Sequence, residues 1–126
     1  MKSFITALCI GVFMITGCVL YMFRVEAISK KLVKLNDETV NMIEQDDYEQ
    51  AQAALTKVFK YLESNTVMLA ATGNHEELDQ MQIFISQLFE YISEQHKGDA
   101  LAHCKALKVM FEHLPKDYRI KAENIL

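Results

Sequence analysis

The residues from Phe4 to Phe23 form an uncharged and mainly apolar stretch, which constrains the fold more than any other part of the chain. Twenty residues of α-helix span about 30 Å, the thickness of the hydrocarbon core of a bilayer. A single segment in lipid has to satisfy its own backbone hydrogen bonds, so it must be helical. Thr6 and Thr16 are too few to give it the polar face of a soluble helix. We therefore predict a single-pass transmembrane anchor over residues 1–23 and a body over residues 24–126.

The segment around Cys18 leaves the fate of this anchor open. Lys2 followed by an apolar run also fits a secretory signal, although no small-residue cleavage site follows the run. Ile15-Thr16-Gly17-Cys18 has the form of a bacterial lipobox, in which the cysteine is lipidated and the chain is cut before it. The apolar run nevertheless continues to Phe23, where a mature lipoprotein usually turns polar. We predict a retained signal-anchor, with a lipid-anchored lipoprotein as the alternative.

The charges that flank the apolar stretch do not fix the orientation of the body. Lys2 lies on the amino side, and Arg24, Lys30, Lys31 and Lys34 lie on the carboxyl side as an ordinary membrane flank. A count of positive charges favours a cytoplasmic body, but long domains are translocated largely regardless of flanking charge. A signal-anchor with the body outside the cytoplasm therefore fits equally well.

The composition of the body argues against nucleic-acid binding. The chain has 13 Lys and Arg and 17 Asp and Glu, and only Lys2 precedes Arg24, so the body carries 12 against 17, a net charge of −5. Nucleic-acid binding requires a basic surface, which this charge does not provide. Cys9 and Cys18 lie in the apolar stretch and Cys104 is alone in the body, which argues against an internal disulfide and against a cysteine metal site.

Apolar residues of the body recur at intervals of three and four, which is typical of amphipathic α-helices. Glycine and proline occur in the body only at Gly73, Gly98 and Pro115, and short connections favour antiparallel neighbours. We predict an all-α fold in which the transmembrane helix continues into an antiparallel bundle of about four helices. The predicted core positions are Val25, Ile28, Leu32, Leu35, Thr39 and Met42, then Tyr48, Ala51, Leu55, Val58 and Leu62, then Leu78, Met81, Ile85, Leu88 and Ile92, and finally Leu101, Cys104, Leu107, Phe111 and Leu114.

The starts of the later helices are predicted from capping residues. Asp46 with Glu49 and Asn74 with Glu77 have the spacing of a capping box, in which the two side chains bond each other's backbone amides. Asp99 is the expected cap of the last main helix. Each predicted cap follows a break in the apolar pattern, and a helix is predicted to start there.

Three breaks are expected inside the body. Asn36-Asp37 is expected to bend or interrupt the first helix, and Thr72-Gly73 is expected to end the second. Pro115 is expected to end the last main helix or to open a short final one. The terminal residues predicted to dock on the bundle are Tyr118, Ile120, Ile125 and Leu126.

A faint internal similarity relates two helices of the body at an offset of 52 residues. It pairs Ala54-Leu55 with Ala106-Leu107 and Phe59 with Phe111. A duplicated helix pair, as in helical repeats, and the chance agreement of two amphipathic helices both explain such a pattern.

The candidate catalytic and metal-binding residues each have a structural explanation. His75-Glu76-Glu77-Leu78-Asp79 is not the His-Glu-x-x-His zinc pattern, and its acidic residues complement the dipole of a helix start. His96, His103, Cys104 and His113 also contain potential ligands. His103 and Cys104, however, are adjacent and point about 100° apart on a helix. Because Cys104 lies on an apolar seam, we expect a core residue rather than a nucleophile, and we assign no catalytic, cofactor-binding or metal-binding residue.

Five short motifs and the amino-terminal span match one known group of sequences. The motifs are Asp47-Tyr48-Glu49-x-Ala51, His75-Glu76-Glu77-Leu78-Asp79, Ala100-Leu101, His113-Leu114-Pro115 and Glu123-Asn124-Ile125-Leu126. Through them the chain resembles a domain-of-unknown-function family of small membrane-anchored proteins from Gram-positive, often spore-forming, bacteria. The resemblance implies a bacterial origin and a membrane location, and it favours an extracytoplasmic body. It implies no activity, cofactor or site residue.

The anchor, the helical body and the lack of a catalytic, cofactor-binding or metal-binding motif together predict a function without catalysis. We expect a protein-interaction or accessory subunit at the cell membrane, with the lipid bilayer and another membrane or envelope protein as partners. Tyr48 is expected to pack at a helix start, whereas Tyr61 and Tyr91 are candidates for an interface. The sequence leaves a homo-oligomer open. The alternative function is an extracytoplasmic ligand-binding sensor with a pocket between its helices.

Overall fold

The computed structural model describes residues 1–71 and 75–125, with side chains described as far as Lys116. These residues form five helices and no strand, so the predicted all-α class is confirmed. The helices are α1 (Lys2–Glu44), α2 (Tyr48–Ser64), α3 (Thr66–Ala70), α4 (His75–Ser93) and α5 (Lys97–Ile125).

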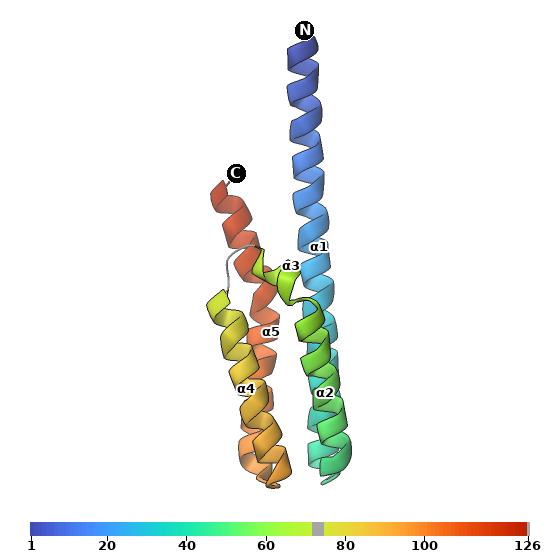
Figure 1. The fold of residues 1–126 in the computed structure, drawn as a ribbon, viewed down its shortest axis with the longest axis vertical. Coiled ribbons are helices and arrows are strands. Elements are labelled where there is room, and N and C mark those ends of the chain that lie inside the picture. Colours follow the sequence, from blue (N-terminus) through green and yellow to red (C-terminus); the bar gives the residue numbers. More distant parts are fainter. Residues whose placement is uncertain (72–74, 126) are drawn as a thin grey trace.

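Four of the helices form an antiparallel bundle with alternating directions. Helix α1 contacts α2 and α5, and α4 contacts the other sides of α2 and α5, so each long helix packs against two neighbours. The amino-terminal half of α1 rises far beyond the bundle, and α5 ascends on the same side (Figure 1). This arrangement matches the predicted bundle with a helical extension, because short connections make successive helices antiparallel.

Helix α1 passes from the apolar stretch into the bundle without a break. It contains Asn36-Asp37 in its interior, so the expected bend or interruption at these two residues is wrong. The side chain of Asn36 is fully buried, and its Nδ2 donates a hydrogen bond to the carbonyl oxygen of Cys104 at 2.8 Å. Helix α5 therefore supplies a partner for this polar side chain, and the backbone of α1 stays helical.

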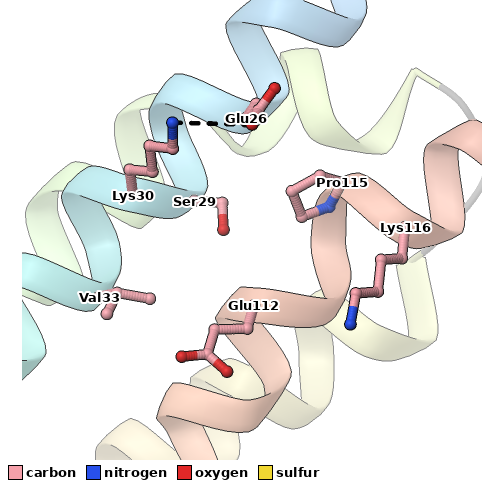
Figure 2. A pocket seen from close by; sticks show the side chains of 7 residues that line it. All are labelled: Glu26, Ser29, Lys30, Val33, Glu112, Pro115 and Lys116. Atoms are coloured by element: carbon pink, nitrogen blue, oxygen red, sulfur yellow. Dashed lines mark ion pairs between the residues drawn. The ribbon is translucent and has the colours of Figure 1, made fainter.

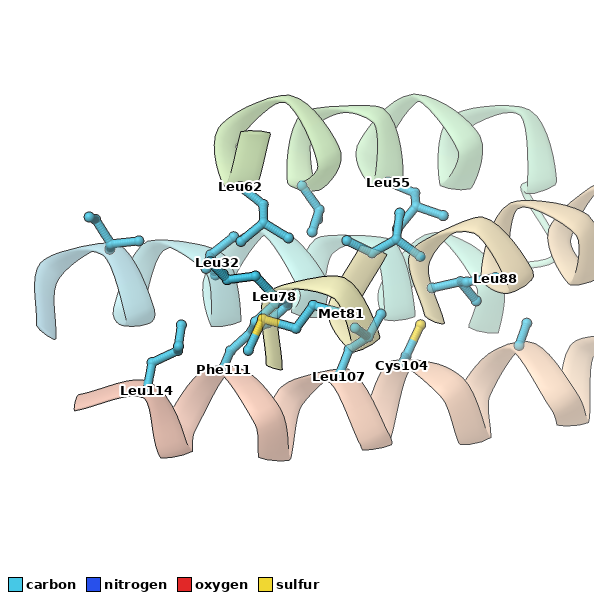
Figure 3. Close-up of a cluster of buried hydrophobic side chains, with 14 of the residues drawn as sticks. Leu32, Leu55, Leu62, Leu78, Met81, Leu88, Cys104, Leu107, Phe111 and Leu114 are labelled. Atoms are coloured by element: carbon cyan, nitrogen blue, oxygen red, sulfur yellow. The ribbon is translucent and has the colours of Figure 1, made fainter. Parts of the chain in front are cut away.

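One continuous hydrophobic core lies between the four long helices (Figure 3). The predicted seams of α2, α4 and α5 are buried except Tyr48 and Leu101, which are half-buried. In α1 the prediction is less accurate, because Leu35 and Met42 are only half-buried. The buried positions of α1 are Val25, Ile28, Ser29, Leu32, Asn36, Thr39 and Ile43.

The turn between α1 and α2 is a Schellman motif with Asp46 at its left-handed position. The N–H of Asp46 donates to the carbonyl of Ile43 at 3.0 Å, and the N–H of Asp47 donates to that of Met42 at 2.9 Å. Asp46 therefore has a φ of 59° and ends α1. The cap of α2 is Asp47, whose Oδ1 accepts from the N–H of Gln50 at 3.2 Å. The predicted cap at Asp46 is wrong by one residue.

The turn between α4 and α5 repeats this motif at Gln95, which also has a φ of 59°. Helix α5 begins at Lys97, so Asp99 lies in its first turn and the predicted cap at Asp99 is wrong. The two turns lie at the same end of the bundle, where the Lys97 ammonium lies 3.1 Å from the Asp46 carboxylate. The α1–α2 and α4–α5 hairpins therefore have the same type of turn at the same end of the bundle.

The second helix is shorter than the sequence indicates. Helix α2 ends at Ser64, and the side chain of Asn65 donates to the carbonyl of Tyr61 at 2.8 Å before α3 begins. The expected helix end at Thr72-Gly73 and the expected cap at Asn74 lie outside the described residues. The side chains of the four terminal residues expected to dock on the bundle also lie outside them.

The two hairpins share one burial pattern, at an offset of 49 residues. The equivalent buried pairs are Ser29 and Leu78, Leu32 and Met81, Asn36 and Ile85, Thr39 and Leu88, Ile43 and Ile92, Ala51 and Ala100, Leu55 and Cys104, Val58 and Leu107, and Leu62 and Phe111. This burial offset differs by three residues from the offset of 52 at which the two sequences are similar. Three residues are close to one helical turn, so both offsets preserve the amphipathic pattern.

Candidate functional site: a wedge between α1 and α5

Pro115 lies inside α5, and the helix continues beyond it. The expectation that Pro115 ends this helix or opens a new one is therefore wrong. Proline has no amide hydrogen, so the carbonyl oxygen of Phe111, four residues earlier, loses its helical donor. The hydroxyl of Ser29 on α1 donates to this oxygen at 2.6 Å. A buried side chain of α1 thus replaces the hydrogen bond that the proline removes, and α5 continues as a helix.

Towards its carboxyl terminus, α5 leans away from α1, and the two helices diverge (Figure 1). Pro115 lies inside this helix, and prolines in helix interiors commonly change the direction of a helix. Two hollows, of about 370 and 170 Å³, lie between the helices at this level, and both are lined by Glu26 and Pro115. We call the two hollows together the wedge. The larger one is the lower hollow, and the smaller one, beside the end of the apolar stretch, is the upper hollow.

The lower hollow of the wedge carries charges of both signs around a small apolar floor. Figure 2 shows its lining side chains, which are Glu26, Ser29, Lys30, Val33, Glu112, Pro115 and Lys116. Two glutamate and two lysine side chains line this hollow, so its formal charge is zero. The Lys30 ammonium lies 3.7 Å from the Glu26 carboxylate, with 78% and 37% of these side chains exposed. Such an exposed pair contributes about 0–1 kcal/mol to stability and is easily exchanged for another partner.

The upper hollow of the wedge is apolar. Val19, Met22 and Phe23, the last turns of the apolar stretch, line it together with Glu26 and Pro115. The wedge therefore passes from apolar to charged within a short distance along α1, where the uncharged sequence ends.

Helix α3 contacts α1 at the same level. The Tyr21 hydroxyl donates to the carbonyl of Met68, in α3, at 2.7 Å. This carbonyl belongs to the last turn of a short helix, where carbonyls lack helical donors. Tyr21 therefore fixes α3 against the part of α1 that lies just above the bundle.

The sequence candidates for chemistry do not come together in one site. His75 begins α4, with Glu76 and Glu77 in its first turn, where their charges favour the helix dipole. His113 lies exposed on α5. Over the described residues, no group of three or more His, Cys, Asp or Glu side chains is placed to hold a metal ion.

His96 and His103 instead belong to a cluster between α4 and α5. The His103 ring packs edge-on against Phe84 and Tyr91, with centroids 5.3 and 4.9 Å apart, and its Nε2 lies 2.9 Å from Gln87 Oε1. His96 lies in the turn, 3.4 Å from Glu94 and 3.8 Å from Asp99. Two aromatic rings and one amide already contact the His103 side chain, so the cluster stabilises the packing of α4 against α5.

Cys104 is a fully buried core residue, as its place on the seam predicts. Burial in apolar surroundings raises the pKa of its thiol from 9.0 to about 12. The thiolate is the nucleophilic form of cysteine, so this environment suppresses the reactivity that catalysis needs.

The three tyrosines singled out from the sequence are half-buried at the edge of the core. Tyr48 packs at the start of α2, as expected. Tyr61 lies under the Lys31 ammonium, 4.6 Å from its ring centroid, and Tyr91 packs against His103. Tyr61 and Tyr91, the two residues considered for an interface, therefore make contacts within the chain.

Sequence reasoning missed the wedge, although one signal was available. A proline on the apolar face of a helix leaves the carbonyl four residues earlier, here Phe111, without a donor. A hydroxyl residue on the core face of a neighbouring helix, here Ser29, is the kind of side chain that satisfies it. Pairing the two requires the register of α1 against α5, which periodicity alone does not give.

The described helices define a class of protein: a four-helix bundle in which one helix carries a long uncovered apolar extension. Helix α1 is long and apolar enough to span a membrane, and none of its most apolar 18-residue window is buried within the chain. The chain belongs to the family described as "Domain of unknown function (DUF4363)", which matches residues 19–125. The predicted resemblance to a family of unknown function is confirmed. No curated protein and no solved structure matches the chain.

Proposed function

We propose that this chain is a single-pass membrane protein whose helical body lies outside the cytoplasm and binds another membrane or envelope protein. In this proposal the chain is a non-enzymatic accessory subunit. The apolar half of α1 is a retained signal-anchor, and Cys18 is an unmodified residue within it.

One observation carries the proposal: α1 is uncovered in its apolar half and forms part of the core in its other half. Phe4, Phe13 and Leu20 are 72%, 81% and 64% exposed, whereas Val25 and Leu32 are fully buried. Soluble proteins rarely leave so large a continuous apolar surface in water. A bilayer covers such a surface without any further protein.

The surroundings of the titratable groups support a function without catalysis. The Cys104 thiol is buried, with a pKa near 12, and His103 packs between aromatic rings. Catalytic groups commonly have a pKa shifted towards the ionised or reactive form, whereas the shift at Cys104 is away from it, and binding of another protein needs no such group.

Membrane anchoring is tested by washing membranes at high pH, which removes peripheral proteins. The wild-type chain is expected to stay in the membrane pellet. Phe13→Lys places a charge at the centre of the stretch, at a cost of about 3 kcal/mol, and is expected to lower the inserted fraction. Lys60→Gln, on the exposed face of α2, is the control. Release of the wild-type chain by the wash would contradict the anchor.

Partner binding is tested by photo-crosslinking the full chain in intact cells. Crosslinking residues replace one exposed residue on each outer face of the bundle, which are Asn41 on α1, Lys60 on α2, Ile83 on α4 and Lys105 on α5. A partner is expected to crosslink from one or two neighbouring faces and to co-purify from mild detergent. Absence of a crosslinked product from every face, together with no co-purifying protein, would contradict the proposal.

The wedge is the observation that favours the alternative function, a ligand-binding module. Its hollows are open to the surface between α1 and α5, and they join an apolar and a charged surface. A ligand there would have to be amphiphilic.

A further inference from the structure

We propose that the wedge between α1 and α5 binds a zwitterionic aminophospholipid, with the headgroup in the charged hollow and the start of an acyl chain in the apolar hollow. This inference rests on the proposed membrane location of α1. It goes further by naming a ligand and the residues that bind it.

The position of the wedge is the first argument. Val19, Met22 and Phe23 line the upper hollow and belong to the end of the stretch that is proposed to lie in the bilayer. Glu26 and Pro115 connect this hollow to the charged one. A phospholipid has the same order of apolar and charged groups. The wedge thus lies at the depth of the headgroups and of the first segments of the acyl chains.

The charges of the lower hollow are the second argument. Lys30 and Lys116 can donate hydrogen bonds to a phosphate, and Glu26 and Glu112 can accept them from a primary ammonium. An aminophospholipid headgroup carries both groups and matches the formal neutrality of the site. An anionic headgroup without an amine would leave the two carboxylates unpaired beside its phosphate. A choline headgroup has no N–H to donate.

The third argument is that the wedge is open without a bound lipid. The N–H that Pro115 lacks would otherwise bond the carbonyl of Phe111 and favour a straight α5. Ser29 satisfies that carbonyl from α1 at 2.6 Å, so the donor that the proline removes is replaced. The wedge is therefore formed before the lipid arrives, and little ordering free energy is lost on binding.

The test uses the full chain in nanodiscs made from equal parts of phosphatidylethanolamine, phosphatidylcholine and phosphatidylglycerol. Native mass spectrometry of the released protein counts the lipids that stay bound. We expect phosphatidylethanolamine adducts to exceed each of the other two by about fivefold, which corresponds to one charge-assisted hydrogen bond at a partly exposed site. The variant Glu112→Gln/Lys116→Gln is expected to lose this preference.

The control variant Glu90→Gln/Lys105→Gln removes the same charges from exposed positions outside the wedge and is expected to keep the preference. Equal retention of the three lipids by the wild type, preference for phosphatidylglycerol, or a preference that survives in the wedge variant would overturn the inference. A wild-type chain that does not enter nanodiscs contradicts the membrane anchor itself, whereas an inserted chain without lipid preference contradicts only the lipid site.

Discussion

Some buried polar residues in this bundle supply a hydrogen bond that a neighbouring helix cannot make itself. Pro115 removes one donor from α5, and Ser29 supplies one from α1. Asn36 donates to Cys104, but its Oδ1 has no hydrogen-bond partner among the described residues. The contact between α1 and α5 is therefore the part of the core where polar groups set the packing.

The pairing of Ser29 with Pro115 predicts a strong coupling between two substitutions. Ser29→Ala leaves the carbonyl of Phe111 buried without a donor, which is expected to lower the free energy of unfolding by about 1–3 kcal/mol. In a Pro115→Ala background the new amide of residue 115 bonds this carbonyl, and the same serine substitution is expected to cost much less. Chemical denaturation of the four variants in detergent measures both costs. Equal costs in the two backgrounds would show that Ser29 does not act on this carbonyl.

The buried thiol of Cys104 predicts a protected residue. With Cys9 and Cys18 replaced by alanine, a maleimide at pH 7 is expected to label the chain only after unfolding. The pKa of the folded thiol is raised from 9.0 to about 12, so its contribution to stability is complete below pH 9.0 and is lost as the pH rises towards 12. The melting temperature should therefore fall more steeply over this range than that of a Cys104→Ala variant. Rapid labelling of the folded chain would contradict this burial.

The helices and their turns show how far the sequence predicts this fold. Periodicity locates the buried faces of α2, α4 and α5, because leucine and isoleucine occupy them. It fails in part on α1, where Ser29 and Asn36 are buried although they are polar. Pro115 signals that the carbonyl of Phe111 needs a donor, but the position of the wedge could not be predicted, since it depends on the register of two helices far apart in the chain. The caps at Asp46 and Asp99 were misplaced because a left-handed residue ends the preceding helix at each turn.

Both turns hold a non-glycine residue with a φ of 59°, which predicts a stabilising substitution. Left-handed backbone costs most residues about 1 kcal/mol or more relative to glycine. Gln95→Gly is expected to raise the free energy of unfolding by about 0.5–1 kcal/mol. Asp46→Gly should gain less, because it also removes the ion pair with Lys97. Thermal unfolding of both variants, with Gln95→Ala as the control, tests the difference. A loss of stability in Gln95→Gly would contradict the turn geometry.

The molecule as a whole combines a long helix with a bundle built on its lower half. Because α1 is one helix from Lys2 to Glu44, the proposed anchor and the body are joined without a flexible linker. The body would therefore stand at a fixed height relative to the bilayer, with α3 and the wedge near the end of the apolar stretch.

The proposed orientation of the body predicts the labelling of an exposed cysteine. Lys60→Cys, on α2, is expected to react with a membrane-impermeant maleimide in intact cells when Cys9 and Cys18 are replaced by alanine. The buried Cys104 contributes no background under these conditions. Labelling that occurs only after the cells are lysed would place the body in the cytoplasm.

The most direct test of one helix passing from the bilayer into the bundle is a scan with spin labels. Single labels replace successive residues from 4 to 34 in lipid vesicles, and their accessibility to oxygen and to a water-soluble nickel complex gives their depth. We predict the greatest depth near Phe13 and, from there, a steady decrease in depth of about 1.5 Å per residue until the surface is reached near Phe23. Labels accessible to nickel throughout residues 4–23, or a depth profile without a single maximum near Phe13, would contradict a continuous membrane-spanning α1.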